Sequence, residues 1–137
     1  MKVYVDASVV LRRTFNQPGA IEDWSQWELV VTSEVLSVEV FRKVDRLRLA
    51  GRLTDDQVAD RLALLHALTA RFLKIPIQSA ILRRAASPFP TALGTLDAIH
   101  LATALLWVEQ NEEPLTLLTH DDALALAARA CGLHVLP

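Results

Sequence analysis

The chain has 137 residues, of which 52% are hydrophobic and 22% charged, and its formal net charge is −2 at pH 7. This composition excludes a disordered chain, and the length is that of one domain. The small net charge excludes a strong overall attraction to nucleic acid or membranes, so any site for a polyanion has to be a local patch. We therefore expect one globular domain over residues 1–137.

The first part of the chain alternates β-branched runs with stretches of helical spacing. Pro18 and Gly19 mark a turn within it. In chain order, the expected elements are a strand at 2–5, a helix at 7–15, a short helix at 20–27 and a strand at 29–32.

Two long helices are expected next. Ser33 is a candidate N-cap for a helix that runs to Ala50, with Gly51 just past its end. The sequence TDDQ at 54–57 is a capping box, which opens a second helix to about Phe72. We expect these two helices to form a helical hairpin that is inserted between strands.

The remaining segments continue the alternation of strands and helices, which predicts an α/β fold with a mainly parallel central sheet flanked by helices. In chain order, we expect a weak strand at 74–77, a helix at 79–86, a Pro/Gly loop at 87–94, an apolar helix at 95–110, a strand at 115–119, a helix at 121–130 closed by Gly132, and a strand at 134–136.

The cellular compartment is suggested by what the sequence lacks. With Cys131 as the only cysteine, an internal disulfide is excluded and a reducing compartment is favoured. Asp6 stands where a signal peptide needs an apolar run. The apolar stretch 98–108 is shorter than the ~20 residues of a membrane span. We expect a cytoplasmic protein that does not associate with membranes.

Four carboxylates are expected at one edge of the sheet, because working sites of parallel sheets lie beyond the carboxyl ends of the strands. Asp6 directly follows the first strand, and Asp121 follows the strand at 115–119. Asp97 begins the apolar helix, and Glu39 lies two turns into the helix after residue 32. Two carboxylates ~5 Å apart repel by roughly 3 kcal/mol at an effective dielectric of 20. The cluster therefore needs protons or a cation, and oxygen-only ligands select Mg²⁺ or Mn²⁺.

Each carboxylate also has a purely structural explanation. Asp97 and Asp121 can complement helix dipoles, Asp6 can cap a helix, and Glu39 can pair with the basic residues three and four positions later. His100 shares a helix face with Asp97. It either orients Asp97 through a hydrogen bond or is a buried histidine with other partners, and we favour the second interpretation.

A basic patch lies beside Glu39. Arg42, Lys43 and Arg46 share its side of the helix, which suits a phosphodiester backbone, although a solvated helix face explains them equally well. The histidine and cysteine pattern gives no zinc site, and no P-loop, dinucleotide-binding glycine motif or serine nucleophile elbow is present.

The segments VDAS, SVEVFRK, TLDAIHLATA and LLTHDDALALAARACGLHV together resemble the PIN-domain nucleases, and among them the VapC toxins of type II toxin–antitoxin modules. The resemblance spans nearly the whole chain and implies a PIN-like fold. It implies an acidic quartet that consists of Asp6, Glu39, Asp97 and Asp121.

Further positions match the same motifs. Thr119 matches the hydroxyl residue that precedes the last acid, and Ser8 and Thr95 match hydroxyl positions near the site. Asp122 stands beside Asp121 and makes the identity of the fourth ligand ambiguous.

The resemblance implies an Mg²⁺- or Mn²⁺-dependent endoribonuclease that leaves a 5′-phosphate and a 3′-hydroxyl. It also implies a VapB-like antitoxin and a homodimer. Arg42 or Lys43 would hold the RNA backbone. The apolar side chains of the helical hairpin are expected to form part of a groove for an antitoxin helix, with packing against the chain's own sheet as the competing explanation. They are Leu47, Leu49, Val58, Leu62 and Leu65.

Three other functions compete with this one. A degenerate PIN fold would only bind partners. A phosphatase of the haloacid-dehalogenase type needs an Asp-x-Asp motif after the first strand, where this chain has Asp6, Ala7 and Ser8. A phosphoacceptor receiver domain needs a lysine after a late strand, and this chain has none there.

Overall fold

Five parallel strands form the central sheet of the computed structural model, which describes residues 1–137. The order across the sheet is β3-β2-β1-β4-β5, and every neighbouring pair is parallel. The strands are β1 (Lys2–Val5), β2 (Leu29–Ser33), β3 (Leu73–Ile75), β4 (Thr116–Leu118) and β5 (His134–Leu136). The predicted α/β class and parallel sheet are confirmed.

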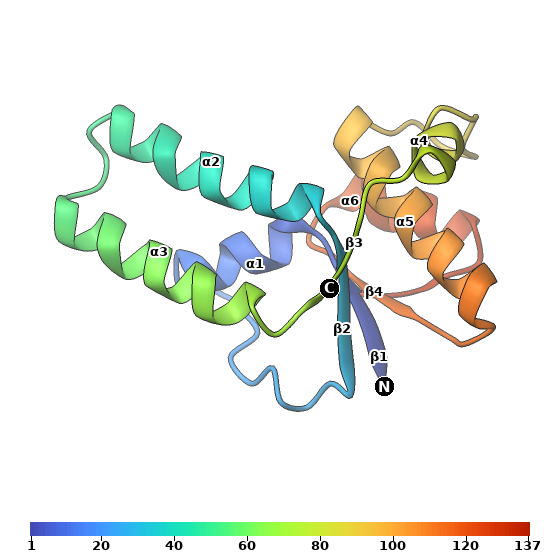
Figure 1. Ribbon diagram of the computed structural model, residues 1–137, viewed down its shortest axis with the longest axis horizontal. Coiled ribbons are helices and arrows are strands. Elements are labelled where there is room, and N and C mark those ends of the chain that lie inside the picture. Colours follow the sequence, from blue (N-terminus) through green and yellow to red (C-terminus); the bar gives the residue numbers. More distant parts are fainter.

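Six helices cover the two faces of this sheet, with α1, α2 and α3 on one side and α4, α5 and α6 on the other (Figure 1). The predicted hairpin is the α2–α3 pair, which links β2 to β3. The helices are α1 (Ala7–Thr14), α2 (Val35–Leu49), α3 (Asp55–Thr69), α4 (Ser79–Ala85), α5 (Thr95–Asn111) and α6 (Asp122–Ala130). No helix is long and apolar enough to span a membrane.

The central strand β1 contributes to two separate cores, because successive side chains of a strand point to opposite faces. Val3 and Val5 belong to the core beneath α1, α2 and α3. Tyr4 belongs to the core beneath α5 and α6, and it is fully buried. Asp6 follows β1 and lies at the carboxyl edge of the sheet, where the two helical layers meet.

Local helix signals explain most of the boundaries. Thr54 caps α3, and the reciprocal bond from the backbone N–H of Thr54 to Gln57 completes the predicted capping box. The prediction that Ser33 caps a helix starting there is wrong by two residues. Ser33 is the last residue of β2, and its hydroxyl accepts a hydrogen bond from the backbone N–H of Val35, where α2 begins.

The helix predicted at 20–27 is wrong. The Asp23 carboxylate accepts hydrogen bonds from the backbone N–H and the hydroxyl of Ser25, and such local bonds compete with helix formation. Trp24 is buried against Phe72, which fixes this segment as an irregular connection to β2. The strand predicted at 74–77 begins one residue earlier and is shorter, because Pro76 has no N–H for the ladder.

Most of the apolar side chains of the helical hairpin pack inward, and the groove for an antitoxin helix stays a prediction. Leu65 is fully buried, and Val58 and Leu62 pack against the core beneath α1, α2 and α3. Of the five apolar side chains, only Leu49 is largely exposed, at 70%. The hairpin uses its apolar side chains to join its own core, which is the competing explanation given above.

Candidate functional site

Asp6 is the most firmly held carboxylate of the sheet edge. It is 4% exposed, and three donors reach it. The Ser8 hydroxyl donates to Oδ1 at 2.7 Å, the Thr119 hydroxyl donates to Oδ2 at 2.9 Å, and the Val9 backbone N–H lies 3.4 Å from Oδ1. Burial raises the pKa of Asp6, although these hydroxyl donors act in the opposite direction. The carboxylate therefore has a fixed orientation.

The same hydroxyls connect the end of β1 to the start of α6. The Thr119 hydroxyl oxygen accepts the backbone N–H of Asp121 at 3.0 Å, and the Ser8 hydroxyl oxygen accepts the backbone N–H of His120 at 2.9 Å. These two bonds place the Asp121 backbone beside Asp6. Ser8 and Thr119, both assigned supporting roles by the resemblance, therefore lie within the site.

Asp121 is the N-cap of α6, and its Oδ1 accepts the Leu124 backbone N–H at 2.8 Å. Its negative charge is the largest charge effect on the Asp97 carboxyl group. Asp122 is exposed, does not contribute to that effect, and begins α6 as its first helical residue. Of the two neighbouring aspartates, the one that faces the site is Asp121.

Asp97 lies in the first turn of α5 and accepts no hydrogen bond. Its pKa is raised to about 6, mainly because the side chain is partly buried and also because Asp121, Asp6 and Glu39 carry negative charge nearby. These four side chains, called the acidic cluster below, are therefore brought together at one edge of the sheet.

Glu39 reaches the acidic cluster from α2 and binds a histidine instead of its basic neighbours. Its Oε2 lies 2.6 Å from His100 Nε2, and no ion pair joins it to Arg42 or Lys43. His100 is 1% exposed, and its Nδ1 lies 2.8 Å from the Tyr4 hydroxyl oxygen. His100 is thus a buried histidine with partners of its own, as we favoured, and its hydrogen bond goes to Glu39 and not to Asp97.

Tyr4 is the site residue that sequence reasoning missed. It lies two positions before Asp6, so strand alternation places the two side chains on the same face of β1. A tyrosine at that position is readily explained as a core residue, so the sequence alone provided no reason to place it in the site. Its hydrogen bond to His100 depends on α5, whose residue 100 lies 96 positions later in the chain.

The donor set of the acidic cluster suits a hard divalent cation, because it consists of carboxylate oxygens with hydroxyls beside them. No group of three or more His, Cys, Asp and Glu side chains is already close enough to hold a metal ion. Binding one would thus require a carboxylate to move inward. Asp97 can do so without breaking a hydrogen bond, whereas Asp6 and Asp121 each accept hydrogen bonds that fix them.

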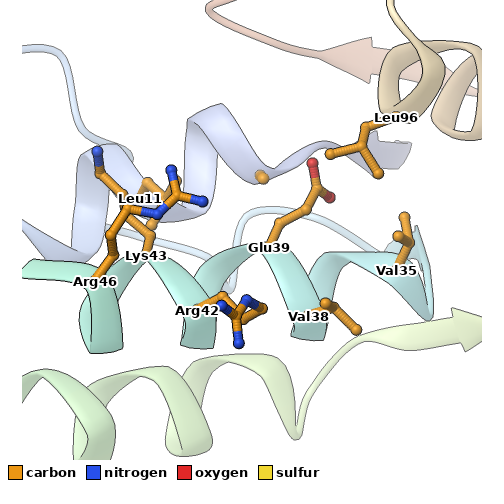
Figure 2. Close-up of a pocket in the computed structure, with 9 residues that line it drawn as sticks. Leu11, Val35, Val38, Glu39, Arg42, Lys43, Arg46 and Leu96 are labelled. Carbon is orange, nitrogen blue, oxygen red and sulfur yellow. The ribbon is translucent and has the colours of Figure 1, made fainter.

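A hollow beside Glu39 combines cationic and apolar side chains (Figure 2). Arg42, Lys43 and Arg46 are exposed and form no ion pair within the chain, so their charges are free for an external anion. Val38 and Leu96 are 57% and 45% exposed and contribute to the apolar side of the hollow. Figure 2 shows the Glu39 carboxylate pointing away from α2, toward Leu96 at the start of α5.

Thr95 is the one supporting residue that the structure does not connect to the acidic cluster. It is exposed at the first position of α5, and its hydroxyl makes no hydrogen bond within the chain. Thr95 is near Asp97 only because the two residues are close in the sequence.

Comparison with known proteins gives consistent matches. The model of the PIN domain family matches residues 3–130. Ribonuclease VapC35 of Mycobacterium tuberculosis, in strains CDC 1551 / Oshkosh and ATCC 25618 / H37Rv, is 32% identical over 141 residues, which cover 98% of this chain and 95% of that protein.

Two crystal structures share the fold. One is a member of the VapBC family of toxin–antitoxin systems, VapBC-5 from M. tuberculosis, with a TM-score of 0.62, 20% identity and coverage of 98% of this chain and 97% of that one. The other is FitAcB from Neisseria gonorrhoeae, with a TM-score of 0.59, 20% identity and coverage of 98% and 96%.

Proposed function

Because the chain belongs to the PIN domain family, we propose that it is an endoribonuclease and the toxin of a type II toxin–antitoxin pair. In this proposal it hydrolyses RNA phosphodiester bonds with Mg²⁺ or Mn²⁺. The expected metal ligands and catalytic residues are Asp6, Glu39, Asp97 and Asp121.

The observation that carries the proposal is the environment of the Asp97 carboxyl group. A carboxyl group with a pKa of about 6 and no hydrogen bond lies among three other carboxylates. No lysine or arginine forms an ion pair with any of the four. Negative charge of this kind, which His100 offsets only in part, is unfavourable in the free protein and becomes favourable when a divalent cation is bound.

The residues around the acidic cluster have different roles in this proposal. A bound cation would lower the pKa of a water molecule and offset the charge that develops on the phosphate. Asp6 supplies a ligand whose orientation is fixed by Ser8 and Thr119. Asp97 supplies a ligand that is free to turn. Arg42 and Lys43 bind backbone phosphates on the α2 side, where they have no partner within the chain.

An antitoxin partner is proposed from the names of the similar proteins, which include a VapBC toxin–antitoxin system. The surface we expect it to cover is the hollow beside Glu39, which lies along α2 of the helical hairpin. Val38 and Leu96 offer exposed apolar contact there, and an occupant of this hollow would block access to Glu39. A homodimer and a cytoplasmic location complete the proposal.

The test is RNA cleavage with and without EDTA. We expect cleavage that requires Mg²⁺ or Mn²⁺ in the parent protein and that Asp6→Asn reduces by about 100- to 1000-fold. Asp122→Asn is the matched control, since this aspartate is exposed and outside the acidic cluster. Metal-independent cleavage, or equal cleavage by Asp6→Asn, would overturn the proposal. A folded protein that cleaves no RNA but binds an antitoxin would be the degenerate binding module.

A further inference from the structure

Glu39 is held by a chain of buried hydrogen bonds that crosses between the two helical layers. Glu39 stands on α2, above one face of the sheet, and His100 stands on α5, above the other. Tyr4 lies on the strand between them. The distances are 2.8 Å from the Tyr4 hydroxyl oxygen to His100 Nδ1 and 2.6 Å from His100 Nε2 to Glu39 Oε2.

The two outer groups fix the orientation of the imidazole ring. Glu39 as a carboxylate can only accept, so Nε2 carries a hydrogen and donates it. The Tyr4 hydroxyl is fully buried and lies against Nδ1, on the other side of the ring. The two contacts therefore use both ring nitrogens of His100. The ring is thereby held in one orientation with its donor aimed at Glu39.

This arrangement occupies one oxygen of Glu39 and leaves the other free. Oε2 accepts from His100, while Oε1 accepts no hydrogen bond. The Glu39 side chain is 16% exposed, so Oε1 still has access to the solvent side. Metal-bound carboxylates typically use one oxygen for the metal and accept a hydrogen bond on the other.

Stability alone does not require such a network. Burying polar partners costs solvation that offsets much of their attraction, and apolar side chains of the same volume would fill this space about as well. Tyr4 and His100 also pack edge to face with ring centroids 5.8 Å apart, an arrangement that a phenylalanine at position 4 would preserve. The hydroxyl of Tyr4 thus adds orientation of His100 and not core volume.

We propose that Tyr4 and His100 are positioning residues, which hold Glu39 with its free oxygen toward the divalent cation of the acidic cluster. The proposal rests on the metal-dependent function proposed above. It predicts that loss of either group weakens cation binding by about 10- to 100-fold, the usual effect of removing a hydrogen-bond partner of a metal ligand.

The test measures Mn²⁺ affinity from the concentration dependence of the melting temperature, without RNA, and then the Mn²⁺ dependence of cleavage. Tyr4→Phe keeps the packing and removes only the hydroxyl. His100→Leu removes the donor to Glu39, and His100→Gln restores a donor near the position of Nε2. Thr69→Val is the matched control, because it removes a buried hydroxyl that bonds only to the backbone of its own helix, away from the site.

We expect Tyr4→Phe and His100→Leu to bind Mn²⁺ about 10- to 100-fold more weakly and to recover cleavage at saturating Mn²⁺. His100→Gln should regain part of the affinity, and Thr69→Val should lose stability only. The proposal is overturned if Tyr4→Phe binds Mn²⁺ as the parent does, a result that stands even where His100→Leu does not fold. If the parent protein binds Mn²⁺ and Glu39→Gln does not, the proposed metal-dependent function still stands even though the positioning role has failed. If the parent protein binds no Mn²⁺, both the positioning role and the proposed function are overturned.

Discussion

The carboxyl end of β1 and the first turn of α5 each place an aspartate in the acidic cluster, but they hold it differently. Asp6 is buried, and two hydroxyls and a backbone N–H fix both of its oxygens. Asp97 is partly exposed and accepts no hydrogen bond, and its pKa is raised to about 6. Asp6 is therefore oriented in the free protein, whereas the charge of Asp97 has no hydrogen-bond or ion-pair partner.

In the proposed metal site, this difference would give the two aspartates separate roles. The fixed side chain would define where a cation binds, and the free side chain would supply the unsatisfied charge that attracts it. A site in which every carboxylate was fully hydrogen-bonded would have less to gain from a cation. The predictions below test whether the two aspartates differ in this way.

The largest effect is expected on catalysis. Asp6→Asn and Asp97→Asn should each reduce RNA cleavage by about 100- to 1000-fold, which is typical for removing one group that stabilises charge at a reacting centre. Steady-state cleavage at saturating Mg²⁺ measures both. A fully active Asp97→Asn protein would mean that the first turn of α5 only complements a helix dipole.

The next effect separates the two aspartates at the start of α6. Asp121→Asn should reduce cleavage by about 100-fold, because it removes a carboxylate that faces the cluster. Asp122→Asn should change it by less than about twofold, because this side chain is exposed. Asparagine keeps the N-cap oxygen of Asp121, so both variants should fold. A larger loss in Asp122→Asn would reverse the assignment.

A smaller effect is expected from the groups that fix Asp6. Thr119→Val keeps the shape of the side chain but removes the hydroxyl that joins Asp6 to the Asp121 backbone. Cleavage should fall by about 10- to 100-fold, whereas Thr119→Ser should retain most of it. Equal activity of the valine and serine variants would show that the fixed orientation of Asp6 is unimportant.

The smallest effect is on stability and concerns Asp97 alone. Its raised pKa means that the folded state keeps a proton which the unfolded chain loses between about pH 4 and pH 6. The free energy of unfolding should therefore fall as pH rises through this window, and the full penalty is present above about pH 7. A shift of about two pKa units corresponds to about 3 kcal/mol, which solvent screening at this half-exposed group reduces to about 1–2 kcal/mol.

Metal-free Asp97→Asn should consequently melt a few degrees above the metal-free parent at pH 8. The relief of about 1–2 kcal/mol exceeds the ~0.3–1 kcal/mol that a carboxylate gains at a helix start. The advantage should shrink toward pH 5, and added Mn²⁺ should stabilise the parent more than the variant. Thermal melts in EDTA and in Mn²⁺ at both pH values measure this. A variant that melts below its parent at pH 8 would contradict the difference between the two aspartates.

The sequence was sufficient for features that depend on local chemistry. The capping box at Thr54, the strand that ends just before Asp6 and the apolar pattern of α5 each follow from neighbouring residues, and the structure confirms them. The parallel alternation of strands and helices also predicted that the four carboxylates would meet at one edge.

Features that depend on distant partners were not predictable in this way. The helix expected at 20–27 is replaced by an irregular segment, because Asp23 bonds to Ser25 and because Trp24 packs on Phe72, which is distant in the sequence. The partner of His100 was missed because helical spacing relates it to Asp97, whereas Glu39 approaches it from another layer. Apolar spacing on the hairpin likewise does not reveal whether Leu65 faces a partner or its own core.

The central position of β1 has a consequence for the timing of assembly during protein synthesis. The strand β1, which Asp6 directly follows, is made more than a hundred residues before one of its two neighbours, β4. The hydroxyl of Thr119 that orients Asp6 is separated from it by 113 positions. A growing chain thus has no complete acidic cluster until Asp121 has been made, and a chain that stops before β4 never acquires one. For the proposed ribonuclease, this order of synthesis predicts that a chain truncated before β4 cleaves no RNA.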